Sequence, residues 1–129
     1  MANLRDNMAS RFAFLFCLLL PVAGCTWNAA DRDATLAHFK AHRGEYQALL
    51  ESVGKDPAGD LSRYQAVLKS IEVQPTTPPI VEVTPIDFYY VLVHAGDEAS
   101  LAVSDAMRDE GRVLKDLGDG WYLVQRGFM

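Results

Sequence analysis

The sequence predicts a small α+β domain in which two helices pack on an antiparallel sheet. In the first half, apolar residues recur at three- and four-residue spacing in two successive segments, as is typical of amphipathic helices. In the second half, two segments are rich in β-branched and aromatic residues, which favours strands. Helices followed by strands, rather than alternating with them, predict an antiparallel sheet that a helix covers.

The first helix is expected over residues 31–55. Asp31 or Asp33 can cap its start, and Gly54 followed by Lys55 suits its end. The residues on its apolar face are Leu36, Phe39, Tyr46, Leu49, Leu50 and Val53.

The residues DPAGD (56–60) interrupt the helical pattern, and a second helix is expected after them, with Asp60 as its cap. Its apolar stripe contains Leu61, Tyr64, Leu68 and Ile71. The sequence EVQPTTPP then reads as a stiff linker, because proline fixes the backbone and removes a hydrogen-bond donor.

Strands are expected in IVEVT (80–84) and IDFYYVLVHA (86–95), and the second is apolar on both faces, as a central strand is. Residues 112–126 predict a hairpin that turns at Gly118-Asp119-Gly120. Residues 97–110 favour a helix with an Asp97 cap, and the alternative is a short strand before an acidic loop.

The N-terminus has the pattern of an export signal. Arg5 and Arg11 precede an unbroken apolar run of 11 residues, Phe12 to Val22, whereas a membrane-spanning helix needs about 20. A basic start, a short apolar run and small residues before a break are typical of a secretory signal. The sequence Val22-Ala23-Gly24-Cys25 resembles the lipobox of bacterial lipoprotein precursors.

This resemblance implies cleavage between Gly24 and Cys25 and attachment of acyl chains to Cys25. Two or three chains would give a lasting membrane anchor, since one chain alone binds only marginally. In this family, an aspartate directly after the lipidated cysteine favours retention in the inner membrane. Thr26 occupies that position here, which implies the outer membrane and its periplasmic face. The expected organisation is a signal peptide at 1–24, a lipidated tether at 25–30 and one α+β domain at 31–129.

Composition argues against nucleic-acid binding. The chain of 129 residues has a net charge of −5 and shows no basic patch with interleaved aromatics. It also shows no phosphate-binding glycine loop, cysteine metal cluster or recognisable catalytic triad. We therefore expect a non-enzymatic protein without a cofactor.

Two groups on the first helix are candidates for a site. His38 and His42 are four residues apart and can reach one metal ion, but no third ligand is evident, so a half-buried and an exposed histidine are the favoured interpretation. Arg43 lies on the face expected to be buried, so its guanidinium needs a polar partner there or must extend outward along its own stem. It can form an ion pair that joins the helix to the sheet, or it can bind an anionic ligand.

Three further candidates lie in the sheet. His94 is expected to be a polar residue at a strand end, and it lacks a nearby nucleophile. Trp121 and Tyr122 follow a turn, where large aromatics either bind sugars or peptides or close the end of a core.

The mature part resembles small uncharacterised proteobacterial lipoproteins, through Phe39 to Arg43 and Trp121 to Leu123. Residues 88–128 also resemble the first half of a SPOR domain, which implies peptidoglycan binding. The leading hypothesis is a lipid-anchored envelope protein that contacts another periplasmic protein. The alternatives are a module that binds peptidoglycan or a small ligand, and a metal-dependent or hydrolytic activity.

Overall fold

The computed structural model describes residues 23–127, with the backbone alone for residues 23–28. Most of the expected signal peptide, including the run that ends at Val22, lies outside these residues. One compact unit begins at Asp31 and contains the whole sheet. Its architecture is α+β, as the sequence predicts.

Three helices precede the sheet: α2 (Ala23–Ala41), α3 (Arg43–Lys55) and α4 (Ser62–Leu68). The expected single helix over 31–55 is therefore two helices that meet at His42, whose φ of −118° and ψ of 31° depart from helical values. Nearby Gly44 has a low helix propensity, which favours a break at this point. None of the helices within the described residues has both the length and the apolar character needed to cross a bilayer.

Five strands form one antiparallel sheet in the order β1-β2-β3-β5-β4. They are β1 (Ser70–Gln74), β2 (Ile80–Thr84), β3 (Tyr90–His94), β4 (Arg112–Gly118) and β5 (Trp121–Gln125). Between β3 and β4 the chain forms a short helix, α5 (Glu98–Ala102), and a 3₁₀ turn, η1 (Asp105–Met107). The helix favoured within residues 97–110 is confirmed over this shorter span, and Asp97 caps it by accepting a hydrogen bond from the Ser100 backbone N–H.

Two predictions about the strands need correction. Residues 70–74 form the edge strand β1, although Ile71 was expected on the second helix and Glu72 in a linker. The helix ends because Lys69 has a φ of 66°, a conformation that interrupts helical hydrogen bonding. The strand expected from Ile86 begins only at Tyr90, because Asp87 accepts hydrogen bonds from the Tyr89 and Tyr90 backbone N–H groups in a turn.

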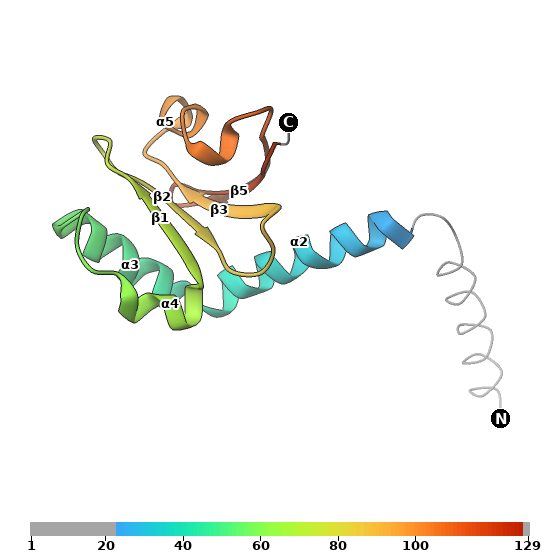
Figure 1. The fold of residues 1–129 in the computed structure, drawn as a ribbon, viewed down its shortest axis with the longest axis horizontal. Helices are drawn as coiled ribbons and strands as arrows, with labels where there is room; N and C mark the ends of the chain where they lie inside the picture. The colour runs from blue at the N-terminus through green and yellow to red at the C-terminus, as the bar shows by residue number, and fades with distance from the viewer. Residues whose placement is uncertain (1–22, 128–129) are drawn as a thin grey trace. The chain divides into compact units, whose positions relative to one another are not determined.

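The sheet is covered on both faces. Figure 1 shows α3 and α4 on one side of the strands and α5 on the other. The helices α2 to α4 bury one set of strand residues: Val81, Val83, Tyr90, Leu92, Trp121 and Leu123. The layer of α5 and η1 buries the alternate set: Ile80, Val91, Val93, Ala95 and Val124. The interpretation of β3 as a central strand that is apolar on both faces is therefore confirmed.

Four rings form the contact between the helices and the sheet. Trp121 is 2% exposed, and its ring centroid lies 5.3 Å from that of Tyr46, 5.6 Å from Phe39 and 5.2 Å from His94. Phe39 and Tyr46 also meet, at 5.0 Å. The rings are strongly tilted to one another, so that the positive edge of one meets the negative face of the next. This aromatic cluster fixes α2 and α3 on β5.

His38 joins the three helices. Its Nε2 lies 3.0 Å from the Val67 carbonyl of α4, and its Nδ1 lies 2.9 Å from the Tyr46 hydroxyl of α3. A carbonyl can only accept, so Nε2 carries the proton, and in the neutral ring Nδ1 accepts from the tyrosine. Burial, the largest contribution, lowers the pKa of His38 and raises that of Tyr46. Both shifts favour the neutral pair.

We predict that Trp121→Ala removes a large part of the stability of the domain. Truncating a fully buried tryptophan costs about 3–5 kcal/mol, against a total of about 5–15 kcal/mol for a typical domain. Urea unfolding followed by circular dichroism would measure the loss. Trp121→Phe keeps a ring against Tyr46 and should lose clearly less. Equal losses for the two variants would contradict the role given to the ring contacts.

We also predict that the domain loses stability as the pH falls from about 7.5 to about 5.5. Burial lowers the pKa values of His38 and His94 in the folded state, whereas an unfolded histidine titrates near 6.5. The unfolded chain therefore binds more protons, so stability is complete above pH 6.5 and is lost as the pH falls through that value towards the folded pKa. Thermal unfolding at several pH values would measure this, and His38→Gln should reduce the dependence. A stability that is constant or increases on acidification over this range would contradict it.

Candidate functional site

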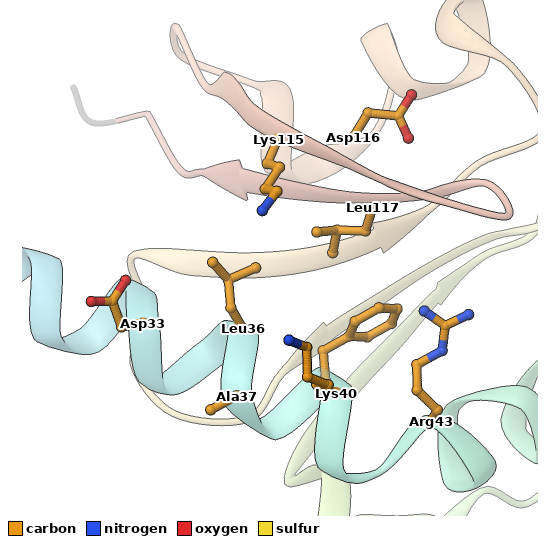
Figure 2. A pocket seen from close by; sticks show the side chains of 9 residues that line it. Asp33, Leu36, Ala37, Lys40, Arg43, Lys115, Asp116 and Leu117 are labelled. Atoms are coloured by element: carbon orange, nitrogen blue, oxygen red, sulfur yellow. The ribbon is translucent and has the colours of Figure 1, made fainter.

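A groove of about 510 Å³ lies between α2 and the edge strand β4. Its floor is apolar, formed by Leu36, Ala37, Phe39 and Leu117. Strand alternation explains the contribution of β4: Figure 2 shows Lys115 and Leu117 pointing towards α2, while Asp116 between them points away. The groove thus combines an apolar base with charged walls.

Cations predominate on these walls. Lys40, Arg43 and Lys115 line the groove together with Asp33 and Asp116, although the chain as a whole has a net charge of −5. Arg43 has an acidic partner, as described below, whereas Lys40 and Lys115 form no ion pair with the residues the structure describes. The groove is therefore suited to a ligand that brings a carboxylate as well as an apolar group.

The outer side of β4 faces no other strand of the described sheet, because β4 stands at the end of the strand order. Its pairing with β5 shifts register between Val113 and Lys115 and again between Asp116 and Gly118. Val113 and Leu114 are 41% and 38% exposed. An edge strand offers unpaired N–H and C=O groups to an extended peptide, and here that edge borders the groove.

Arg43 is the sequence-predicted residue that lies in the groove. Its guanidinium stacks over the Phe39 ring, 4.5 Å from the centroid, and Nη2 donates to Asp119 Oδ2 at 3.1 Å. The Arg43 side chain is 45% exposed and extends outward along the aromatic ring, which is one of the two outcomes expected for a guanidinium on this face. The expected ion pair between the helix and the sheet is present, and it joins α3 to the β4–β5 turn.

His94 contacts the same turn. It ends β3, as predicted, and its Nε2 lies 3.0 Å from the Asp119 carbonyl. Because a carbonyl only accepts, Nε2 carries a proton, and a neutral His94 ring can make this hydrogen bond. Burial favours the neutral ring, because it lowers the pKa of His94. His94 therefore supports the turn that also holds Arg43.

The two aromatics of the sequence WYLV lie on opposite faces of the sheet. Trp121 is in the aromatic cluster, so its ring closes the core and offers no open surface for a sugar; of the two roles considered, the core role is the one the burial supports. Tyr122 is half-buried against the layer of α5 and η1. The structure brings Arg43, His94 and Trp121 together around the Asp119 turn, but not Tyr122.

The His38 and His42 rings are neighbours, with centroids 4.4 Å apart. Both ring nitrogens of His38 already have protein partners, and His42 Nδ1 lies 3.7 Å from Glu45 Oε1. Within residues 29–127, these histidines are not part of a group of three or more potential metal ligands.

The predicted lipidation site lies at the start of α2. The backbone of Gly24 and Cys25 is helical, and so is that of the expected tether at 25–30. The side chain of Cys25 lies outside the part of the chain whose side chains are described.

Most of the groove has no signature in the sequence. Lys40, Lys115 and Leu117 are ordinary helix and strand residues, and only the approach of α2 to β4 gives them a common surface. A different residue, Glu82, does have a signal, because it is the single charged residue in the strand IVEVT and has apolar residues on both sides.

Comparison with known proteins adds no family to these observations: no family model, curated protein or solved structure matches the chain.

Proposed function

We propose that the protein is a non-enzymatic, lipid-anchored protein of the bacterial cell envelope that binds a partner protein through the groove between α2 and β4. The observation that carries the binding role is the groove itself, with its apolar floor, its lysines and the open β4 edge beside it. Acyl chains on Cys25 would hold the protein on the periplasmic face of the outer membrane.

The anchor is supported by the sequence pattern that ends at Cys25. A short apolar run after a weakly basic start suits export, and a lipobox-like end suits acylation. An anchor that consists of acyl chains needs no membrane-spanning helix in the folded part.

A partner with an extended, acidic and partly apolar segment fits the groove best. Its backbone can pair with β4, an apolar side chain can pack on Leu36 and Leu117, and its carboxylates can meet Lys40 and Lys115. Pairing along a strand edge supplies affinity, while alternate side chains supply specificity.

A non-enzymatic role is supported by the state of His38. Its Nε2 lies on the Val67 carbonyl and its Nδ1 on the Tyr46 hydroxyl. Because both ring nitrogens have protein partners, this ring contributes to structure and offers neither nitrogen to a substrate.

We predict that Cys25 carries the anchor. Intact mass spectrometry of the membrane fraction should show the loss of residues 1–24 and the added mass of two or three acyl chains, both absent from a Cys25→Ala variant. An uncleaved, unacylated chain in both samples would contradict the anchor and leave the groove proposal unaffected.

We predict that a photo-crosslinking residue at Val113 captures one defined envelope protein in intact cells. Val113 lies on the open edge strand and is 41% exposed, whereas Val103, the matched control, is 64% exposed and lies after α5, outside the strands. Lys115→Glu should lower the yield from Val113 at least about fivefold, because charge reversal repels an acidic partner. Lys55→Glu, a reversal at the exposed end of α3, should leave it unchanged.

Equal crosslinking from Val113 and Val103, or none from Val113, would contradict the groove as the binding surface. Purified peptidoglycan provides the test of the rival function. Sedimentation of the protein with peptidoglycan would favour the glycan-binding module, although Trp121 would need to leave the core to stack on a sugar.

A further inference from the structure

Three carboxylates converge at the opposite edge of the sheet, away from the groove. Glu72 of β1 and Glu82 of β2 are paired across the two strands, and Asp105 of η1 lies above them. One carboxylate oxygen from each lies within 4.8 Å of the other two. Like charges directly opposite each other on neighbouring strands are destabilising, so this arrangement needs a compensating cation or proton.

Glu82 has an unsatisfied oxygen. The residue is 3% exposed, and its Oε2 accepts from the Ala106 backbone N–H at 2.8 Å. Its Oε1 is buried and has no hydrogen-bond partner. Leaving a buried carboxylate oxygen without a partner is costly, and such an atom marks a position where a further group can bind.

The nearby cations are held elsewhere. Arg108 pairs with Asp105 through Oδ1. Arg126 stacks over the Phe88 ring and donates to the Phe88 carbonyl and to Thr84 Oγ1. Burial, the largest influence, raises the pKa of the Glu82 carboxyl, although the Ala106 N–H and Arg126 favour its charged form. Neither arginine supplies a hydrogen bond to Glu82 Oε1.

There is room for an ion beside the three carboxylates. A cavity of about 360 Å³ is lined by Glu72, Glu82 and Asp105 together with Val73, Gln74 and Pro75. Gln74 does not compete for the position, because its Oε1 accepts from the Asp105 backbone N–H and its Nε2 donates to the Val103 carbonyl. Glu72 and Asp105 are exposed, so an ion can reach the cluster from their side.

We infer that Glu72, Glu82 and Asp105 form a calcium site that ties η1 to the β1–β2 edge. All three ligands are oxygen atoms, which hard cations prefer. Calcium binds oxygen at about 2.3–2.6 Å, so no two of its ligands can lie more than about 5.2 Å apart. The three carboxylate oxygens meet this condition, because all of them lie within 4.8 Å of one another. Waters in the cavity would complete the six to eight ligands that calcium takes. Magnesium fits less well, because it usually binds through one or two carboxylates and keeps more of its waters.

The test uses the full chain, purified in detergent and freed of metal with a chelator. Titration calorimetry with CaCl₂ at pH 7.5 should show one ion per chain with a dissociation constant of about 10⁻⁵–10⁻³ M. Saturating calcium should raise the melting temperature by several degrees, since the ion binds the folded state. Glu72→Gln and Glu82→Gln should each weaken binding at least about tenfold.

Three comparisons make the result decisive. Glu72 is exposed, so Glu72→Gln tests the site even if a change at buried Glu82 disturbs folding. Glu51→Gln, which removes an exposed acid on α3, should bind calcium like the wild type. Tighter binding of magnesium than of calcium would overturn the choice of ion. No binding at 10 mM calcium, or binding that Glu72→Gln and Glu82→Gln leave unchanged, would overturn the site.

Discussion

The rest of the structure depends on the contact of Trp121 with Tyr46 and Phe39. This contact joins the first residue of β5 to two helices from the other end of the chain, and it therefore sets the distance between α2 and the sheet. The same approach forms the groove and brings Arg43 to the Asp119 turn at 3.1 Å. The packing of Trp121 in the core thus determines the shape of the groove on the surface. A close-packed interior transmits such constraints to the residues that surround it.

Two histidines stabilise this arrangement in their neutral state. His38 satisfies a carbonyl of α4 and the hydroxyl of Tyr46, and His94 satisfies the Asp119 carbonyl beneath the turn that Arg43 contacts. A buried tyrosine hydroxyl without a partner would be costly, so His38 allows Tyr46 to occupy the centre of the core. The helices, the aromatic cluster and the turn are therefore connected through polar contacts as well as through apolar ones.

Local signals predict the elements of this fold better than their boundaries. Apolar spacing identifies the helices, and Gly118-Asp119-Gly120 identifies the hairpin. The sequence does not predict β1, because Ile71 follows Leu68 at a spacing that also suits a helix. In addition, Lys69 adopts a positive φ, which a glycine in the sequence would usually indicate. The groove and the carboxylate cluster are not predictable locally, since each joins segments more than twenty residues apart.

The edge strand β4 also has to avoid pairing with a second copy of itself. Charged side chains and irregular pairing discourage such contacts at a sheet edge. β4 has both, in Arg112 and Lys115 and in its two register shifts against β5. The same cations attract a strand that carries acids, so repulsion of one partner and attraction of another come from the same side chains. The apolar Val113 and Leu114, exposed between these charges, can then contribute affinity for the accepted partner. Under the proposed function, the pattern of β4 therefore serves selective pairing as well as protection of an edge.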